Sequence, residues 1–545
     1  MSIPATDNSA TVNTPRRSKN VPRRSGAVFV AAGIFLSRIL GLVRTHFLSG
    51  ALGQSIAADA WMYASRIPNI LNNLFGEGSL SASFIPVYAG LVRDGNDEEA
   101  GRTAGAVAAI LALIVAVGVA LGVLFAGPIT SVIASGLSAP GKEATRALTI
   151  RLTRILFPSA GLVVMCAWCL GVLNSHRRFF MSYAVQGLSN IVLIIALLIF
   201  RHSPDLAHIV TMVAWASVIG AALMFLVQLP RVLSLVKRLR ISLGRGHEPT
   251  RAVIRNAIPA FIGRGVNQIS AFIDLWIASY MPSTLAGLLG YSQNLYMLPV
   301  SLFGMSISAA ELAEMSHVRG SAVDEAYTAT LRSRLDTGLR RIAFFVVPSA
   351  MAFFALGGVV VALIFEGGRF GRAQSELTWS IVAGSGIGLL AATMGRLYSS
   401  TYYVLRDTRT PLIFAAIRVA LTGSLGWLLA IWVPRWLHID LKWGAAGLTA
   451  SAGMAAWVEF TLLRRTMNRR IGRTGVAAGF TAMLWLAAGI SAALGWGVKL
   501  VLPFHQPILA GVIIVGVYGA AYFAITAALG IRESRLLFQR ARSFL

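Results

Sequence analysis

The stretch GAVFVAAGIFLSRILGLVRTHFLSGALG, residues 26–53, is long and apolar enough to cross a membrane, yet it carries Arg38 and Arg44. A membrane helix needs about 20 mostly apolar residues, and each arginine near the centre of a bilayer costs roughly 2.5–3.5 kcal/mol on insertion scales. The segment exceeds the apolar region of a signal peptide and shows no persuasive cleavage site. We therefore interpret it as an uncleaved first membrane helix whose two arginines need shielding from lipid.

The whole chain shares this apolar character. Of its 545 residues 56% are hydrophobic and 13% are charged, with a mean hydropathy of +0.69, whereas a soluble domain carries about 25% charged residues. These values predict an all-α polytopic membrane protein. We expect fourteen transmembrane helices, near residues 27–50, 56–91, 104–135, 145–173, 182–201, 206–232, 250–281, 284–316, 336–365, 375–404, 409–433, 440–466, 474–502 and 505–530.

The net charge of +26 lies in loops between these spans. A nucleic-acid-binding protein would collect its basic residues on one face, so we exclude nucleic acid as a partner. The loops on the side of the N-terminal tail, together with both terminal tails, hold roughly 32 of the 48 Lys and Arg, and the opposite loops hold roughly eight. Because basic loops remain in the cytoplasm, we expect both termini there.

The basic loop 231–255 divides the spans into six before it and eight after it. The first span of each half carries charged residues, which suggests two six-helix lobes and a two-helix addition. The predicted domains are a disordered cytoplasmic tail (1–25), a first lobe (26–235), a basic cytoplasmic linker (236–250), a second lobe (251–468), two C-terminal helices (469–532) and a cytoplasmic tail (533–545).

Ionisable residues inside a membrane normally face a bundle interior or a water-filled cavity. Arginine is in excess among them, and a guanidinium matches phosphate oxygens bidentately. We predict a cationic cavity between the lobes, with Arg38 and Arg44 binding an anionic ligand. For Asp59, Arg66 and Glu77, ion pairing or helix capping is an equal alternative. The intramembrane ionisable residues are Arg38, Arg44, Asp59, Arg66, Glu77, Arg151, Arg154, Arg264, Asp274, Glu311, Glu314, Arg396, Arg418 and Glu459.

Two further stretches bear on function. PNILNNLFGEGSLSASFIPVY (68–88) places Pro, Gly and Ser inside a span, which favours broken backbone beside a cavity. GSGIGLL (384–390) resembles a nucleotide loop but lies in a span, so we interpret it as close helix packing. P-loop, paired-histidine and G-x-S-x-G motifs do not occur. We therefore expect no enzyme activity and no cofactor, and transport driven by an ion, potential or substrate gradient.

Several motifs together resemble the MurJ/MviN family, lipid II flippases of the multidrug/oligosaccharidyl-lipid/polysaccharide (MOP) exporter superfamily. The resemblance runs from about residue 27 to 530. The motifs are SRILGLVR (37–44), AADAWMYASRIPNILNNLFGEGSLSASFIPVY (57–88), GVLNSHRRF (171–179), IPAFIGRGVNQISAFIDLWIAS (258–279), VVPSAMA (346–352), FEGGRF (365–370) and YYVLRDTRTP (402–411).

This resemblance implies a V-shaped pair of lobes, with the last two helices forming a groove for a polyprenyl tail. Alternating access carries lipid II, an undecaprenyl-diphosphate-linked disaccharide–pentapeptide, from the inner to the outer leaflet of the bacterial cytoplasmic membrane for cell-wall synthesis. The implied partners are this polyprenyl-linked saccharide, membrane lipids and cell-wall synthesis proteins.

The resemblance also implies roles for individual residues. Arg44 would contact the diphosphate or another bound anion, and Asp59 would orient an arginine or couple to an ion. Asp274 is a second candidate for ion coupling, and the coupling ion itself cannot be read from the sequence. The predicted substrate-binding residues are Arg38, Arg44, Asp59, Arg66, Asn72, Glu77, Arg264 and Asn294.

The chain departs from the family pattern within this site. Thr45 replaces an acid, Asn72 replaces an arginine, and Gln293-Asn294 replaces Asp-Arg. Arg264 and Arg66 lie where new positive charge could compensate. Two alternatives to lipid II flipping therefore stay open: a divergent paralogue that exports another polyprenyl-linked glycan, and a membrane scaffold that binds a precursor or partner without transport.

Overall fold

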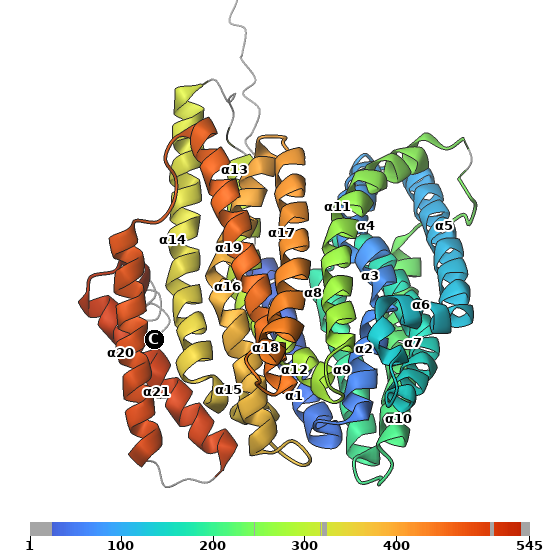
Figure 1. Ribbon diagram of the computed structural model, residues 1–545. Coiled ribbons are helices and arrows are strands. Elements are labelled where there is room, and N and C mark those ends of the chain that lie inside the picture. Colours follow the sequence, from blue (N-terminus) through green and yellow to red (C-terminus); the bar gives the residue numbers. More distant parts are fainter. Residues whose placement is uncertain (1–23, 245, 317, 319–323, 502–505, 536–545) are drawn as a thin grey trace, which may run out of the picture.

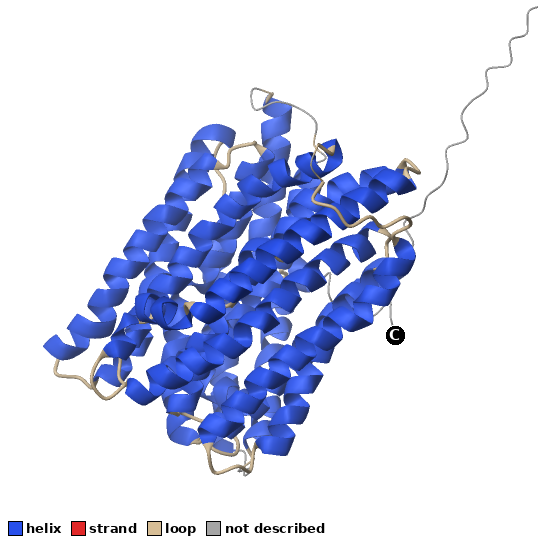
Figure 2. Ribbon diagram, turned by 90° about the vertical axis from the view of Figure 1, so that its right-hand side faces the viewer, coloured by secondary structure: helices blue, strands red, loops and turns tan. Residues whose placement is uncertain are grey.

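The computed structural model describes residues 24–244, 246–316, 318, 324–501 and 506–535. Within these ranges the chain is helical apart from turns, loops and one isolated bridge between Gly367 and Phe370. Figures 1 and 2 show long helices running side by side. The predicted all-α fold is confirmed. The tail expected to be disordered over 1–25 lies outside the described residues except for its last two, which begin α1.

The helices of the first half are α1 (Arg24–Leu52), α2 (Ile56–Arg66), α3 (Asn69–Phe75), α4 (Glu77–Arg93), α5 (Asp97–Leu124), α6 (Ala126–Ile133), η1 (Ser135–Ser138), α7 (Glu143–Ser175), α8 (Phe179–Ala184), α9 (Gln186–Phe200) and α10 (Leu206–Leu235). Those of the second half are α11 (Glu248–Ser279), α12 (Leu285–Pro299), η2 (Val300–Met305), α13 (Ser306–Ser316), α14 (Glu325–Ala355), α15 (Gly357–Phe365), α16 (Arg372–Val404), α17 (Arg409–Trp427), η3 (Leu428–Trp432), α18 (Val433–Trp436), η4 (Leu441–Trp443), α19 (Gly444–Ile471), α20 (Ala478–Val501) and α21 (Pro507–Ala528).

Eleven helices or helix runs among the described residues are long and apolar enough to cross a membrane. They correspond to the third to sixth and the eighth to fourteenth predicted spans. The other three predicted spans fall on α1, on the run α2–α4 and on α11. Two of these are continuous helices with charged residues, and the third is broken. The total of fourteen spans stays a prediction.

The broken span is the predicted stretch 68–88. Pro68 separates α2 from α3, and Gly76 adopts an extended conformation (φ −76°, ψ −160°) between α3 and α4. Ser79 donates its hydroxyl hydrogen to the Leu74 carbonyl across this break. The helix is thus interrupted twice within the predicted span, and a side-chain hydroxyl satisfies one of the freed carbonyl groups.

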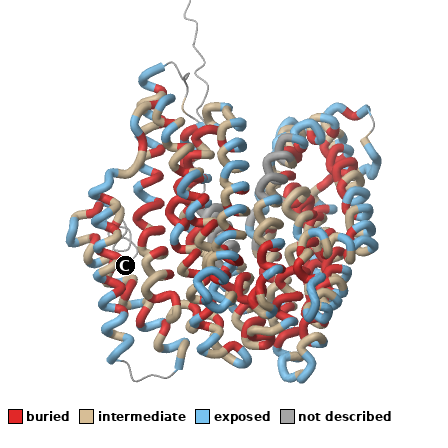
Figure 3. The backbone as a smooth tube through the Cα atoms, in the orientation of Figure 1, coloured by how far each residue is buried: buried red, intermediate tan, exposed pale blue. Residues whose placement is uncertain are grey.

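Helices of the first half pack around α7, and those of the second half around α16. In the most apolar window of each, 61% and 67% of the residues are buried, the highest shares among the candidate spans of the described chain. Figure 3 shows buried residues concentrated on the inner helices, with exposed residues on the outer faces. Exposed apolar side chains such as Leu486, Leu500 and Val512 are those of a surface that meets lipid.

The predicted lobe boundary falls beside α11, which packs against α3 and α4 on one side and α17 on the other. This helix therefore lies where the two halves meet (Figure 1). The C-terminal pair α20 and α21 packs against α14 and α15 at the edge of the second half.

Glycines in GSGIGLL allow α16 to approach α19 closely. A Cβ atom on Gly388 would lie 2.2 Å from Gly453 Cα, and one on Gly384 would lie 2.5 Å from the Ala446 carbonyl oxygen. The interpretation of this stretch as close helix packing is confirmed.

Cys166 and Cys169 are free thiols, and both are buried inside α7.

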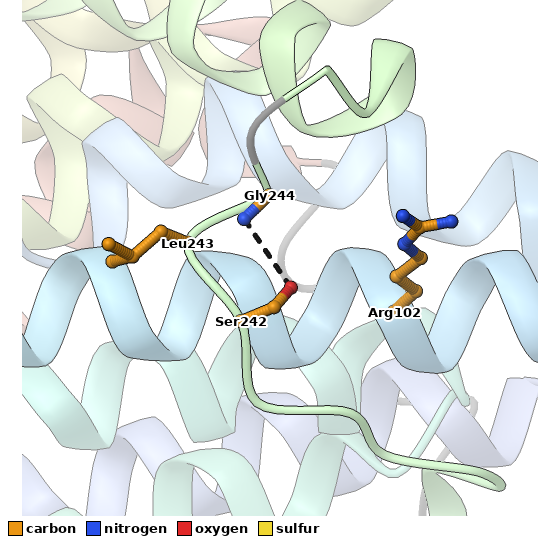
Figure 4. Close-up of a pocket in the computed structure, with 4 residues that line it drawn as sticks. All are labelled: Arg102, Ser242, Leu243 and Gly244. Atoms are coloured by element: carbon orange, nitrogen blue, oxygen red, sulfur yellow. Dashed lines mark hydrogen bonds between the residues drawn. The ribbon is translucent and has the colours of Figure 1, made fainter.

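Ion pairs hold the linker between the halves against the start of α5. Asp97, Glu98 and Glu99 form the first turn of α5, and these three residues pair with basic residues of the linker. The pairs are Lys237–Asp97 (2.9 Å), Arg238–Glu98 (3.4 Å), Arg240–Glu98 (3.4 Å) and His247–Glu99. Figure 4 shows the linker following α5 beside a surface pocket lined by Arg102, Ser242, Leu243 and Gly244. This pocket is separate from the intramembrane charges.

We expect Gly388→Val to destabilise the chain, because the added atoms overlap the α19 backbone and overpacking costs about 1–3 kcal/mol. The measurement is the melting temperature and the monodisperse fraction in detergent. Gly519→Ala is the matched control, since a Cβ at Gly519 meets no heavy atom within 4 Å. Equal melting temperatures for the two variants would contradict the packing argument.

Candidate functional site

Arg44 is half-buried and contacts a neutral partner. Its Nη1 atom donates to Oδ1 of Asn190 on α9 at 3.0 Å. The Asn190 amide in turn donates to the Ser37 carbonyl of α1 at 3.4 Å. Thr45 donates its hydroxyl hydrogen to the Gly41 carbonyl at 2.8 Å. The amide orients Arg44 without cancelling its positive charge, so the guanidinium remains able to attract an anion.

Arg38 is exposed and makes no hydrogen bond or ion pair with the described side chains. It lies fourteen residues before Leu52, about 21 Å from that end of α1, whereas Arg44 lies about 12 Å from it. An arginine facing lipid at this depth is costly, so its exposure favours a wet surface. The two arginines thus share one helix but have different surroundings.

Asp59 joins the two halves of the protein. Its carboxylate is almost fully buried, with Oδ2 accepting from the Thr284 amide at 2.6 Å and Oδ1 accepting from the Gly287 amide at 2.7 Å. These amides belong to the start of α12, which has no side-chain cap of its own. Asp59 therefore caps α12 across the interface, where a negative charge stabilises the positive end of the helix dipole.

A lysine makes the complementary contact at the neighbouring helix end. Lys142 Nζ donates to the carbonyl oxygens of Ser279 (2.7 Å) and Met281 (2.5 Å), where α11 ends. The Gly136 amide donates to the Ser279 hydroxyl at 2.9 Å. A cation at the carboxyl end of α11 and an anion at the amino end of α12 both match the helix dipoles.

Further hydrogen bonds gather at the same end of the bundle. Ser49 donates to the Phe365 carbonyl at 3.1 Å, and Arg369 donates to the Ala51 carbonyl at 2.8 Å. We call this region, formed by residues 46–59, 135–142, 279–291 and 364–370, the junction end. The described hydrogen bonds between the membrane-spanning halves are concentrated there.

Three predicted substrate-binding residues differ in their surroundings. Asn72 donates to Asn69 Oδ1 at 3.3 Å within α3. Asn294 is exposed on α12. Arg66 ends α2, half-buried, and its main electrostatic partner is Asp274. Glu77, another predicted residue, begins α4, and Arg264 lies within α11. The side chains of both fall outside the described ones.

A second group of charges lies on α11, α16, α17 and α19. Arg418 Nε is 3.2 Å from Glu459 Oε2. The charge of Arg418 also acts on Asp274, and the charge of Arg396 acts on Glu459. The sequence identified all four of these residues as intramembrane charges. Only Asp274 was among the predicted site residues. The described residues contain no cluster of three or more His, Cys, Asp or Glu that could hold a metal ion.

The family model described as lipid II flippase MurJ matches residues 48–519. The chain belongs to this family. The resemblance of its motifs is thereby confirmed. Among its relatives, a probable lipid II flippase MurJ of Bdellovibrio bacteriovorus is 29% identical over 454 residues, covering 81% of this chain and 82% of the relative. The corresponding protein of Vibrio cholerae is 27% identical over 529 residues, covering 93% and 96%.

Two solved structures have a similar fold. A lipid II flippase MurJ in an inward closed conformation matches with a TM-score of 0.74 at 22% identity, covering 92% of this chain and 98% of that chain. An inward-facing MATE transporter of the MOP superfamily matches with a TM-score of 0.63 at 17% identity, covering 82% and 98%. At these identities the likeness concerns the fold alone, and it confirms the predicted all-α polytopic architecture.

We expect Asp59→Asn to loosen the junction end, because a neutral amide is a weaker cap than a carboxylate and hydrogen bonds to charged groups contribute about 1.5–3 kcal/mol each. In a background with Cys166→Ala and Cys169→Ala, an Ala286→Cys reporter should react with a maleimide at least about tenfold faster in this variant. Ala286 is otherwise only 3% exposed.

Asp205→Asn is the matched control for this labelling experiment. Asp205 also caps a helix, accepting from the Ala207 amide at 2.8 Å, but it does so within the first half. Its loss should leave the reporter rate unchanged. An unchanged rate in Asp59→Asn would show that the interlobe cap does not hold the junction end closed.

Proposed function

We propose that the chain flips lipid II across the bacterial cytoplasmic membrane by alternating access, delivering it to the outer leaflet for cell-wall synthesis. The family match over residues 48–519 carries this proposal. The relatives from Bdellovibrio bacteriovorus and Vibrio cholerae are both named for lipid II flipping. Each match covers more than four-fifths of this chain and more than four-fifths of the relative. Positive charge at membrane depth adds a physical reason, since the diphosphate of the substrate is anionic.

Loop charge supports an orientation with both termini in the cytoplasm. In that orientation the junction end faces the outside of the cell, because α1 runs from the N-terminal tail to Leu52. Contacts by Asp59 and Lys142 then close the outer side. Delivery of substrate to the outer leaflet requires both contacts to separate, so that water replaces the helix-end partners.

Arg44 and Arg38 serve this cycle as anion-binding groups. A diphosphate that enters a bilayer loses its hydration, and guanidinium groups replace part of it with charge-assisted hydrogen bonds. Asn190 leaves the charge of Arg44 uncompensated. The exposed apolar faces of α20 and α21 offer a surface for the polyprenyl tail.

The alternatives are less well supported. A polyprenyl-linked glycan other than lipid II has no counterpart among the named relatives, and a scaffold without transport gives no reason for an interlobe helix cap. Asp59 and Asp274 stay predicted candidates for ion coupling. Cell-wall synthesis proteins stay predicted partners.

We expect the chain to restore growth to a bacterium depleted of its own lipid II flippase, and Arg44→Ala to lose this rescue because the site loses its uncompensated cation. The measurement is colony formation together with the amount of lipid II exposed in the outer leaflet. Arg372→Ala is the control, since that side chain is 88% exposed and pairs only with its neighbour Glu376.

Failure of a well-expressed and correctly inserted wild-type chain to rescue growth would count against lipid II as the substrate. Rescue by Arg44→Ala at the wild-type level would instead remove this arginine from the binding site.

A further inference from the structure

The motif VVPSAMA (346–352) places a proline inside α14, one of the candidate membrane helices. Proline has no backbone N–H, so the helical hydrogen bond from Pro348 to the carbonyl group of Phe344 cannot form. Phe344 is fully buried. A carbonyl group without a donor is costly at membrane depth, because hydrocarbon supplies none. The carbonyl group that Pro348 frees therefore needs a donor from outside the backbone of α14.

A tyrosine of α21 is this donor. The Tyr522 hydroxyl donates to the Phe344 carbonyl oxygen at 2.7 Å, and the centroids of the two rings lie 5.6 Å apart. Tyr522 is only 2% exposed, so the bond is shielded from water. Prolines are tolerated in membrane helices where a neighbouring helix satisfies the freed group, and here that helix is α21.

A second tyrosine makes a similar contact one turn away. Tyr518 donates its hydroxyl hydrogen to the Pro348 carbonyl oxygen at 2.6 Å. The two tyrosines are four residues apart on α21, and their acceptors are four residues apart on α14 in the opposite order. Side chains four residues apart share one face of a helix. The pair of bonds therefore fixes both the rotation and the register of α21 relative to α14.

Further contacts continue along α14 in both directions. Trp496 of α20 donates to the carbonyl oxygen of Ala355, the last residue of α14, at 2.8 Å. Towards the start of α14, Arg340 pairs with Glu533 at 3.2 Å and lies 4.1 Å from the ring centroid of Phe480 on α20. With the two tyrosine acceptors, these positions recur at intervals of four or seven residues, which places them along one face of α14.

The polar contacts matter because apolar packing gives little position within a membrane. Lipid tails are as apolar as the side chains that they contact, so helices gain little from exchanging one for the other. The apolar cluster of Leu356, Ala492, Ile514 and Tyr518 fills space between the C-terminal pair and α14. Directional bonds to backbone carbonyl groups select one arrangement among those that such packing allows.

We propose that Tyr518 and Tyr522 are positioning residues, which dock α20 and α21 on the carbonyl groups beside Pro348 so that the pair presents its exposed apolar faces to the polyprenyl tail. This inference rests on the proposed function for the identity of the tail. Leu486 on α20 and Val512 on α21 belong to these faces, with 66% and 57% exposed. Both tyrosines are buried, so they act through the position of their helix and not by touching the lipid.

Binding of two labelled forms of lipid II to the purified full chain in lipid nanodiscs tests this role. One form has the full-length polyprenyl tail, and the other has a tail of a few isoprene units. We expect Tyr522→Phe to raise the Kd of the full-length form about threefold to tenfold, the effect of losing one hydrogen bond. Tyr518→Phe should act in the same direction.

The short-tailed form separates positioning from a general loss of structure. Its tail buries little surface on α20 and α21, so its Kd should change less than about twofold in either variant. Each variant is compared with the wild-type chain for the same lipid, so the different partitioning of the two forms cancels. An equal rise of the Kd for both forms would show general destabilisation and would overturn the positioning role.

A Pro348→Ala background tests the part played by the proline. Alanine restores an N–H group at residue 348 that can donate to the Phe344 carbonyl oxygen. Tyr522→Phe should then change the Kd of the full-length form by less than about twofold, because the acceptor no longer depends on the tyrosine. If Tyr522→Phe has the same effect in both backgrounds, the proline does not create the docking point.

Tyr402→Phe is the matched control. Tyr402 is fully buried and donates to the Leu463 carbonyl oxygen at 3.1 Å, in a contact between α16 and α19 that does not involve the C-terminal pair. Met467, four residues after Leu463, has the backbone N–H that proline lacks. This variant should leave both Kd values within about twofold of the wild-type values. Size-exclusion profiles and melting temperatures accompany every variant.

A polyprenyl diphosphate without the saccharide distinguishes this inference from the proposed function. Binding and flipping of lipid II by the wild-type chain, with an unchanged Kd in Tyr522→Phe, overturns the inference and leaves the proposed function intact. Binding of the polyprenyl diphosphate that weakens in Tyr522→Phe, without binding of lipid II, keeps the inference and overturns lipid II as the substrate.

Discussion

A charged side chain at membrane depth has to find a polar partner, because hydrocarbon offers no solvation and the surrounding helices supply all of it. The described structure meets this constraint in three different ways. Arg44 takes a neutral amide, Asp59 takes the amides at the start of α12, and Arg418 takes a carboxylate. The kind of partner decides how much charge remains for a ligand.

Helix ends make a reversible interface. An apolar contact between lobes would be difficult to wet, whereas the amides of α12 and the carbonyl groups of α11 are equally well satisfied by water. Asp59 and Lys142 bring opposite charges to these two ends in agreement with the helix dipoles. Closure is therefore specific in position and modest in free energy, which suits a protein that has to alternate between two states.

Apolar runs and loop charge were enough to predict the helical membrane fold, and the glycines of residues 384–390 were enough to predict close helix packing there, although not that α19 is the partner. Partners of the charged residues were not predictable in this way. Asp59 and Gly287 are separated by 228 residues, and Arg44 and Asn190 by 146. Arg418 and Glu459 were visible as intramembrane charges, but only the packing of α17 against α19 brings them into contact.

Charge compensation differs between the two halves. Arg418 is paired with the carboxylate of Glu459, whereas Arg44 contacts only the uncharged amide of Asn190. An anion that approaches Arg418 has to compete with this carboxylate, and an anion that approaches Arg44 does not. Of these two arginines, Arg44 is therefore the one whose charge its described surroundings leave available, and Arg418 is the one whose charge they neutralise.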